Sequence, residues 1–235
     1  MNDIHPTAVI EGDVRFGSGN TVGPNVVVYG PATIGDDNWI GAGVVIGAPP
    51  EVRAFEHPRR GGAASVSAGV QIGSRNVIRE YAQVHGGWKH MTSVGDDTFI
   101  MNQVYVAHDC ILDDGVTLAS SVLLAGHVRV GANANLGLGT TVHQGLYVGR
   151  GAMVGMGSVV TRDVPPFAMA YGNPARVASA NSVGMRRLGV PDDAVSELAA
   201  LYEADDGPDG LPEASDVPVL DSAFREWWSR TTARA

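Results

Sequence analysis

Aliphatic or aromatic residues recur at every sixth position through most of this chain. The recurring positions are Ile4, Ile10, Phe16, Val22, Val28, Ile34, Ile40 and Ile46, then Ile72, Ile78 and Val84, then Val94, Ile100, Val106, Leu112, Leu118, Leu124, Val130, Leu136, Val142, Val148, Val154 and Val160. A period of six matches neither the turn of a helix nor the alternation of a single strand. It predicts short strands joined by turns, with three strands making one coil of a triangular prism.

Coils of such a prism stack at the interstrand spacing of roughly 4.8 Å, so about eight coils give a prism on the order of 38 Å long. Glycine, at 31 of 235 residues, directly follows the apolar residue in many hexads. We expect this glycine, or the small polar residue in its place, to turn the corner, often with a positive φ.

The first interruption of the register covers residues 48–69. Its Pro and Gly residues indicate a loop that leaves the prism. Arg53, His57, Arg59 and Arg60 lie in it. Loops on rigid scaffolds often bind ligands, so this segment is either a binding loop or a solvated charged loop.

The second interruption covers residues 86–93 and contains Trp88, Lys89 and His90. It brings an aromatic ring and two basic or titratable side chains together, although His90 on its own reads as an ordinary loop histidine. Lys89 is the single lysine of the chain.

The pattern stops after Val160, and we expect a prism domain at residues 1–176 followed by a helical extension at 177–235. Residues 172–176 are expected to form an irregular exit from the last coil. Pro191 with two acidic residues after it is typical of a helix start. The expected helices are Val183–Leu188, Pro191–Tyr202 and Phe224–Trp228, with a linker at 205–216.

A net charge of −9 argues against a nucleic acid or an anionic membrane as partner. An anionic substrate would need a local basic patch. The single Cys110 excludes an internal disulfide. The N-terminus has no pattern of a signal peptide and no apolar run reaches 18 residues, so we expect no membrane span and a cytoplasmic location.

Coils of 18 residues predict which side chains lie above one another. His108, Gly126 and Gln144 form one column, and His127 and His143 flank it. Allowing for the second interruption, His85 falls one coil below Ala107. We therefore expect these histidines to gather on one edge of the prism.

His108 followed by Asp109 is the candidate for chemistry. A general base needs an imidazole whose tautomer is fixed by an acceptor. Neighbouring residues of a strand point to opposite faces, so a contact between the two requires a turn, a water or a neighbouring coil. Acyl transfer also needs an oxyanion donor, and the Gly126 N–H is the candidate. Zinc ligation by the histidines and a purely structural corner histidine are the alternatives.

Four motifs occur in order and carry a resemblance: Ala107-His108-Asp109-Cys110, Leu124-Ala125-Gly126-His127-Val128, Val142-His143-Gln144 and Asp163-Val164-Pro165-Pro166. With the hexads, they resemble the hexapeptide-repeat acyltransferase superfamily, in particular its branch that transfers acyl groups from acyl carrier protein to UDP-N-acetylglucosamine in lipid A synthesis. The resemblance implies a left-handed parallel β-helix, all-β with a small helical tail, that assembles as a homotrimer. General rules on crossover connections would favour the opposite hand.

The resemblance also implies roles for particular residues. His108 is the base that deprotonates the sugar hydroxyl, Asp109 orients it, and the Gly126 N–H stabilises the oxyanion. Residues expected to bind the acceptor are His85, Tyr105, His127, His143, Gln144, Glu51 and Arg53. Residues expected on the donor or acyl side are Met156, Asn173, Asn181, Arg186 and Arg187. No metal and no bound cofactor are implied.

The chain departs from the family pattern at several of these positions. Tyr105 stands where the family has a histidine, and the segment Glu51–Phe55 lacks the Asp and Lys of the family's sugar-binding loop. Met156 stands where the family has glycine and should shorten the acyl tunnel. Pro174 replaces another family histidine. We therefore expect altered pockets around an unchanged catalytic centre.

These patterns predict an acyltransferase that moves a short or medium acyl group from acyl carrier protein, or from acyl-CoA, to the hydroxyl of a sugar or nucleotide sugar. N-acylation of an amino sugar is the first alternative. A zinc-dependent protein of the γ-type carbonic anhydrase class and a non-enzymatic trimer are the others.

Overall fold

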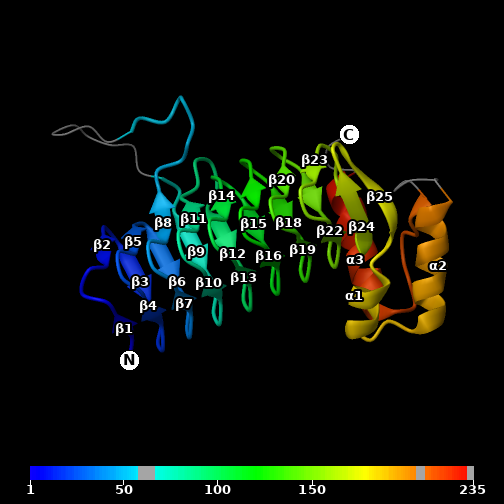
Figure 1. Cartoon of the computed structure of the whole chain (residues 1–235), viewed down its shortest axis with the longest axis horizontal. Coiled ribbons are helices and arrows are strands. Elements are labelled where there is room, and N and C mark those ends of the chain that lie inside the picture. Colours follow the sequence, from blue (N-terminus) through cyan, green and yellow to red (C-terminus); the bar gives the residue numbers. More distant parts are fainter. Residues whose placement is uncertain (58–66, 205–209, 232–235) are drawn as a thin grey trace.

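The computed structural model describes residues 1–57, 67–204 and 210–231, and its three sheets form the expected left-handed parallel β-helix with a helical tail (Figure 1). Sheet A contains β1 (Asp3–Ile4), β4 (Thr21–Val22), β7 (Trp39–Ile40), β10 (Val77–Ile78), β13 (Phe99–Ile100), β16 (Thr117–Leu118), β19 (Asn135–Leu136), β22 (Met153–Val154), β24 (Ala168–Gly172) and β25 (Ala175–Ala180). Sheet B contains β2 (Val9–Glu11), β5 (Val27–Tyr29), β8 (Val45–Ala48), β11 (Gln83–His85), β14 (Tyr105–Val106), β17 (Leu123–Leu124), β20 (Thr141–Val142) and β23 (Val159–Val160). Sheet C contains β3 (Val14–Phe16), β6 (Ala32–Ile34), β9 (Val70–Ile72), β12 (Thr92–Val94), β15 (Ile111–Leu112), β18 (Arg129–Val130) and β21 (Tyr147–Val148).

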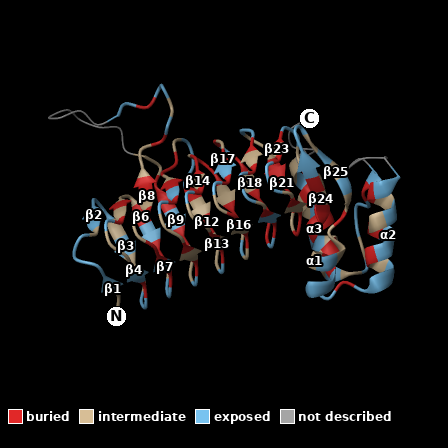
Figure 2. Ribbon diagram, viewed as in Figure 1, coloured by how far each residue is buried: buried red, intermediate tan, exposed pale blue. Residues whose placement is uncertain are grey.

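The aliphatic column of the hexads forms the core, as the period predicts. Val106 pairs with Leu124, and Leu124 with Val142, so residues 18 apart lie above one another. These side chains are almost fully buried, and the buried column runs from Val22 to Val160 (Figure 2). At the open end of the prism, Ile4 and Ile10 of the first coil are 39% and 40% exposed. The first interruption does not break this stacking, because Ile34 still pairs with Ile72.

A second buried position lies two residues before each core aliphatic, at the corner. On the corner between sheets C and A it carries a ladder of asparagines. Asn38 Nδ2 donates to the side-chain Oδ1 of Asn20 at 3.0 Å and to Gly73 O at 2.9 Å. Cys110 occupies the equivalent place on another corner, where burial raises the pKa of its thiol to about 12.

The expectation for the corner glycines was wrong in one respect. The left-handed φ falls three residues after the core aliphatic, at Asn25, Asp97 and Asp109 for example, whereas most glycines directly after the aliphatic have no positive φ. Those glycines are needed for close approach: a Cβ on Gly73 would lie 2.6 Å from the Gly95 carbonyl oxygen of the next coil. A side chain there would push the coils apart.

Both interruptions leave the prism as loops on one side. The first runs from the end of β8 to β9, and its residues 58–66, with Arg59 and Arg60, lie outside the described part of the chain. The second is shorter than expected, because β12 already begins at Thr92. The two loops are joined, since the Ala68 N–H donates to Gly87 O at 2.7 Å.

The exit from the prism is a β-hairpin, which corrects the irregular segment expected at 172–176. Strand β24 pairs in parallel with β22, and β25 then returns antiparallel to β24. The expected domain boundary at 176/177 therefore cuts β25, which ends at Ala180.

Three helices follow and pack at the C-terminal end of the prism (Figure 1). They are α1 (Ser182–Arg187), α2 (Asp192–Glu203) and α3 (Pro218–Thr231). The last is longer than the short helix expected around Phe224–Trp228. Its Trp227 ring packs 6.0 Å from that of Tyr147 on β21. Within the described ranges, no helix is long and apolar enough to cross a membrane.

Candidate active site

His108 and Asp109 form a hydrogen-bonded dyad at the corner between β14 and β15. His108 Nδ1 lies 2.6 Å from Asp109 Oδ2. The contact between neighbours arises because Asp109 adopts the left-handed turn conformation, with φ of 61°, which swings its carboxylate back onto the imidazole. Since a carboxylate only accepts, Nδ1 carries the proton and Nε2 keeps its lone pair.

The Asp109 carboxylate sits in a cradle of backbone donors from the second loop. The N–H groups of Trp88 and Lys89 donate to it at 3.1 and 2.8 Å, and that of His90 makes a shorter contact. Burial raises the pKa of Asp109, but the hydrogen bonds from His108 and the three backbone donors outweigh it, so the pKa lies below the usual value. The carboxylate is therefore held charged.

Gly126 lies directly against the imidazole, as the 18-residue column predicts. A Cβ at this position would lie 2.6 Å from both Nε2 and Cε1 of His108. The Gly126 N–H makes no hydrogen bond within the described ranges of the chain. The residue that packs against the candidate base thus has a backbone donor without a partner in the described ranges.

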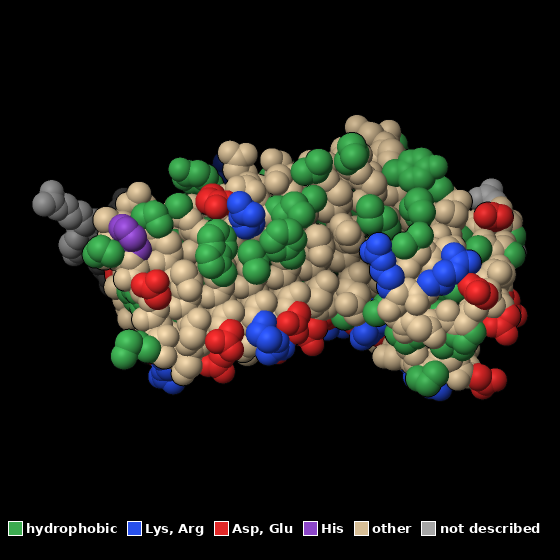
Figure 3. Space-filling view, turned by 60° about the horizontal axis from the view of Figure 1, so that its bottom comes forward, with side chains coloured by type: hydrophobic (Ala, Val, Ile, Leu, Met, Phe, Trp, Pro, Cys, Tyr) green, Lys and Arg blue, Asp and Glu red, His purple; other side chains and the backbone are tan. Residues whose placement is uncertain are grey.

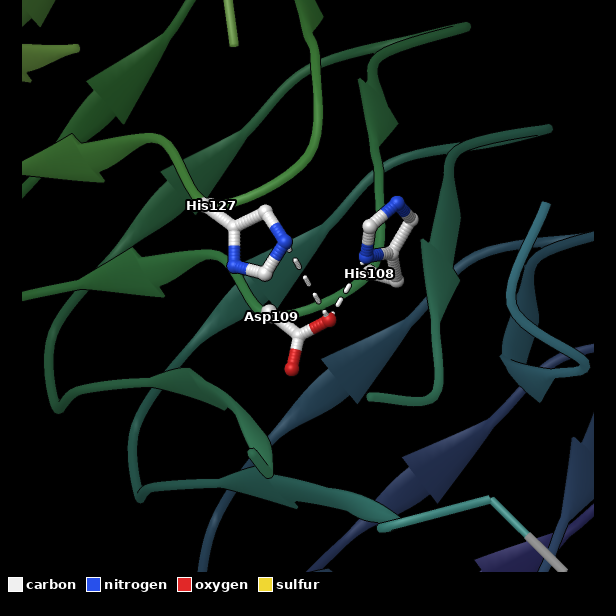
Figure 4. A group of neighbouring side chains, drawn as sticks. All are labelled: His108, Asp109 and His127. Carbon is white, nitrogen blue, oxygen red and sulfur yellow. Dashed lines mark hydrogen bonds and ion pairs between the residues drawn. The ribbon is translucent and has the colours of Figure 1, made fainter. Parts of the chain in front are cut away.

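His127 is the second imidazole of this corner. Its ring stands edge-on to His108 at 5.1 Å, and its Nε2 lies 3.9 Å from Asp109 Oδ2 (Figure 4). His143 and Gln144 lie one coil further along the same edge and are exposed, and His143 Nδ1 approaches Gln144 O at 3.2 Å. The expected gathering of histidines on one edge is present for His108 and His127, with His143 beside them on the surface.

A second polar cluster is made of residues expected to bind the acceptor: Tyr105 on β14, His85 on β11 one coil below, and Glu51 in the first loop. The Tyr105 hydroxyl donates a short hydrogen bond to Glu51. His85 Nε2 lies 3.4 Å from the same Glu51 oxygen, and His85 Nδ1 donates to Pro49 O at 3.1 Å. Burial, followed by the contact with Glu51, raises the pKa of Tyr105. Arg53 is exposed in the same loop.

The atoms that could hold a metal are His108, Asp109 and His127, whose ligand atoms lie within 4.8 Å of one another. A carboxylate has about four acceptor positions. Those of Asp109 are filled by three backbone N–H groups and by the His108 Nδ1–H. A metal would have to displace this cradle, so the arrangement suits proton transfer better than ligation.

The residues expected on the donor side lie away from the dyad in a single chain. Met156 is 74% exposed and sits at the corner between sheets A and B, whereas His108 sits between sheets B and C. Asn173 is in the β24–β25 turn, and Arg187 is exposed on α1.

Two further donor-side residues have structural contacts. Asn181 caps α1, since its Oδ1 accepts from the Gly184 N–H at 3.0 Å and its Nδ2 donates to Gly151 O. Arg186 pairs with Asp192 on the surface. The donor-binding roles of these residues remain predictions.

Three features around the dyad were not predicted from the sequence: the backbone cradle, the Trp88 ring and Thr92. The rings of Trp88 and His108 stand perpendicular to each other, with their centres 6.3 Å apart. Thr92 Oγ1 accepts the Asp109 N–H at 2.9 Å. Backbone donors have no signature in the sequence, although the aromatic and basic residues of the loop had marked it as unusual.

Family models match three segments of the chain. Residues 13–48 and 91–126 match the bacterial transferase hexapeptide (six repeats), and residues 163–204 match UDP-N-acetylglucosamine O-acyltransferase, domain 2.

Among curated proteins, the acyl-[acyl-carrier-protein]–UDP-N-acetylglucosamine O-acyltransferase of Thermodesulfovibrio yellowstonii is 46% identical over 57% of this chain and 54% of its own length. That of Paraburkholderia xenovorans is 38% identical over 66% of this chain and 57% of its own length. The aligned part thus spans about half the length of these curated relatives.

Two solved structures cover nearly the whole chain. The UDP-N-acetylglucosamine acyltransferase from Campylobacter jejuni is 31% identical over 95% of this chain and 90% of its own, with a TM-score of 0.70. LpxA from Acinetobacter baumannii is 27% identical over 96% and 95%, with a TM-score of 0.72.

Proposed function

Because this chain belongs to the hexapeptide-repeat acyltransferase superfamily, we propose that it moves an acyl group from a phosphopantetheine thioester to a hydroxyl of a UDP-N-acetylglucosamine-like nucleotide sugar. The single observation that supports this best is the His108–Asp109 dyad packed against Gly126, whose N–H makes no hydrogen bond within the described part of the chain. The acyl donor is a thioester of acyl carrier protein, which the names of the relatives include, or of coenzyme A.

In the first step, the acceptor hydroxyl gives its proton to His108 Nε2 while its oxygen attacks the thioester carbonyl carbon. Asp109 keeps the proton on Nδ1 and stabilises the imidazolium that forms. The hydrogen bonds of the cradle keep Asp109 charged, so the proton on His108 Nδ1 does not move to the carboxylate. A positioned base of this kind contributes roughly 10²–10⁴-fold in rate.

In the second step, the tetrahedral intermediate collapses. Its oxyanion accepts a hydrogen bond from the Gly126 N–H, an interaction that contributes roughly 10²–10³-fold in rate. The C–S bond then breaks and the leaving thiolate takes the proton back from His108. Acyl transfer is direct, and the enzyme forms no covalent intermediate.

The active assembly in this proposal is a homotrimer. Met156 and His108 lie on different corners of one prism, so a neighbouring copy has to bring a Met156 to the acyl chain bound near His108. Leu123, Leu138 and Met156 are 42%, 50% and 74% exposed, and hydrophobic side chains gather along the prism on the side seen in Figure 3. Copies that pack through this surface would bury them. The cytoplasmic location remains a prediction.

N-acylation of an amino sugar is the second candidate, and Glu51 is the observation that favours it. One of its oxygens contacts Tyr105 and His85, two of the residues proposed to bind the acceptor. A carboxylate there would attract an amino sugar, and the same base would serve.

A screen of donors against acceptors tests the function. Acyl carrier protein and coenzyme A thioesters of several chain lengths are incubated with UDP-sugars that carry a hydroxyl or an amine, and the products are identified by mass spectrometry. We expect an O-acylated UDP-sugar. An N-acylated product would establish the second candidate instead, and no acyl product with any pair would contradict both.

A further inference from the structure

Trp88 and Lys89 stand beside the proposed base, and the proposed mechanism gives their side chains no task. The Trp88 ring is 6.3 Å from the His108 ring. The Lys89 ammonium lies 4.0 Å from the centre of the Trp88 ring, in a cation–π contact. Lys89 is exposed, and no described carboxylate forms an ion pair with it.

The loop that carries the pair is fixed to the dyad. The backbone N–H groups of Trp88 and Lys89 both donate to Asp109. On the other side, the N–H groups of Gly86 and Gly87 donate to Ala48 O and Gly69 O at 2.8 and 2.9 Å. The ammonium is therefore anchored near His108 both through its own backbone and through the aromatic ring below it.

A cation fixed at this place points to an anionic ligand. The chain carries a net charge of −9, so an anionic substrate meets overall repulsion and depends on local positive charge. The single lysine of the chain supplies that charge beside the proposed site of acyl transfer. An ammonium binds phosphate oxygens through charge-assisted hydrogen bonds.

We propose that Lys89, held over the Trp88 ring, binds the diphosphate of the nucleotide-sugar acceptor while the sugar hydroxyl lies on His108. This inference rests on the proposed function. In a nucleotide sugar, only the sugar ring separates a ring hydroxyl from the anomeric phosphate, which matches the short path from His108 across Trp88 to Lys89. In the donor, the whole pantetheine arm separates the thioester from its phosphate, which places that phosphate much further from His108.

Calorimetric titration with UDP-N-acetylglucosamine tests the site directly. Lys89→Met should raise the Kd about 5- to 30-fold at low salt, the effect of losing a charge-assisted hydrogen bond. Lys89→Arg should keep most of the affinity. Arg15→Met removes one positive charge from an exposed position in the first coils and is the matched control. The difference between wild type and Lys89→Met should shrink as salt screens the charges.

Competition with UDP and with uridine locates the interaction on the phosphates. Lys89→Met should weaken UDP and leave uridine unchanged. An equal Kd for wild type and Lys89→Met would overturn the proposal, and so would a variant that raises KM for the acyl donor alone. Binding is measured without turnover. A protein that transfers no acyl group but still loses UDP affinity in Lys89→Met would therefore refute the proposed function and support this site.

Discussion

At the scale of single residues, Asp109 both forms the turn between β14 and β15 and holds His108, the proposed base. Its left-handed backbone makes the turn that every coil requires, and the same turn places the carboxylate on His108. Such a conformation costs a residue with a Cβ roughly 1–2 kcal/mol, which the four hydrogen bonds to the carboxylate offset. The sequence predicted the His-Asp pair, but not the turn that allows the two side chains to meet.

Asp109→Asn should lower both activity and stability. The pKa of Asp109 is lowered in the fold, so its contribution to the free energy of unfolding is complete above the ordinary carboxyl pKa of about 4 and disappears as pH falls through the lowered value. The variant should lose about 2 kcal/mol at pH 7, and the gap to wild type should close in acid. Urea unfolding at pH 7 and in acid measures this, with the exposed Asp13→Asn as control. A gap that is the same at both pH values would contradict the role of the charge.

At the scale of elements, the period of six predicted nearly every strand of the prism and the two loops, because a regular apolar column leaves a clear pattern. The β24–β25 hairpin was missed since its strands pair outside that repeat, around Gly172 and Pro174. The cradle of the second loop was missed because its donors are backbone N–H groups, which any residue has. The sequence marked the loop only through its residue types, the aromatic and basic side chains of Trp88, Lys89 and His90.

Gly87→Ala should open this cradle. A Cβ there would lie 1.6 Å from the His90 carbonyl oxygen, so the loop has to move away from Asp109. We expect a loss of kcat of at least roughly 10-fold together with a lower melting temperature. Gly12→Ala is the control: Gly12 has a positive φ, which Gly87 lacks, so the substitution strains its backbone, but the added Cβ meets only ordinary contacts, with the nearest atom at 3.4 Å, and the residue lies in the first coils. Equal kcat values in the two variants would show that the cradle does not position the dyad.

At the scale of the whole molecule, the prism provides rigid corners, and the proposed acyl transfer takes place at one of them. The fold and the position of Gly126 beside His108 could be predicted from the sequence, since both follow from stacking coils of 18 residues. How Met156 relates to His108 could not, because the two sit on different corners of one prism and the proposed trimer would have to bring them together. The resemblance, rather than the period, supplied the trimer and the handedness.

Met156→Gly should lengthen the preferred acyl chain, since an exposed thioether that closes the tunnel in the trimer would be removed. Rates with a series of acyl donors measure the shift, and Val9→Ala, an exposed apolar side chain of the first coil, is the control. An unchanged chain-length profile would place the end of the tunnel elsewhere.

The most direct test of the whole account is the initial rate of acyl transfer to UDP-N-acetylglucosamine by wild type, His108→Ala and His5→Ala. His5 lies exposed in the first coil and controls for the loss of an imidazole. We predict that His108→Ala falls by roughly 10²–10⁴-fold while His5→Ala keeps the wild-type rate. A His108→Ala enzyme that is folded and works within about two-fold of wild type, where the base effect predicts at least roughly 10², would contradict the assignment of His108 as the base.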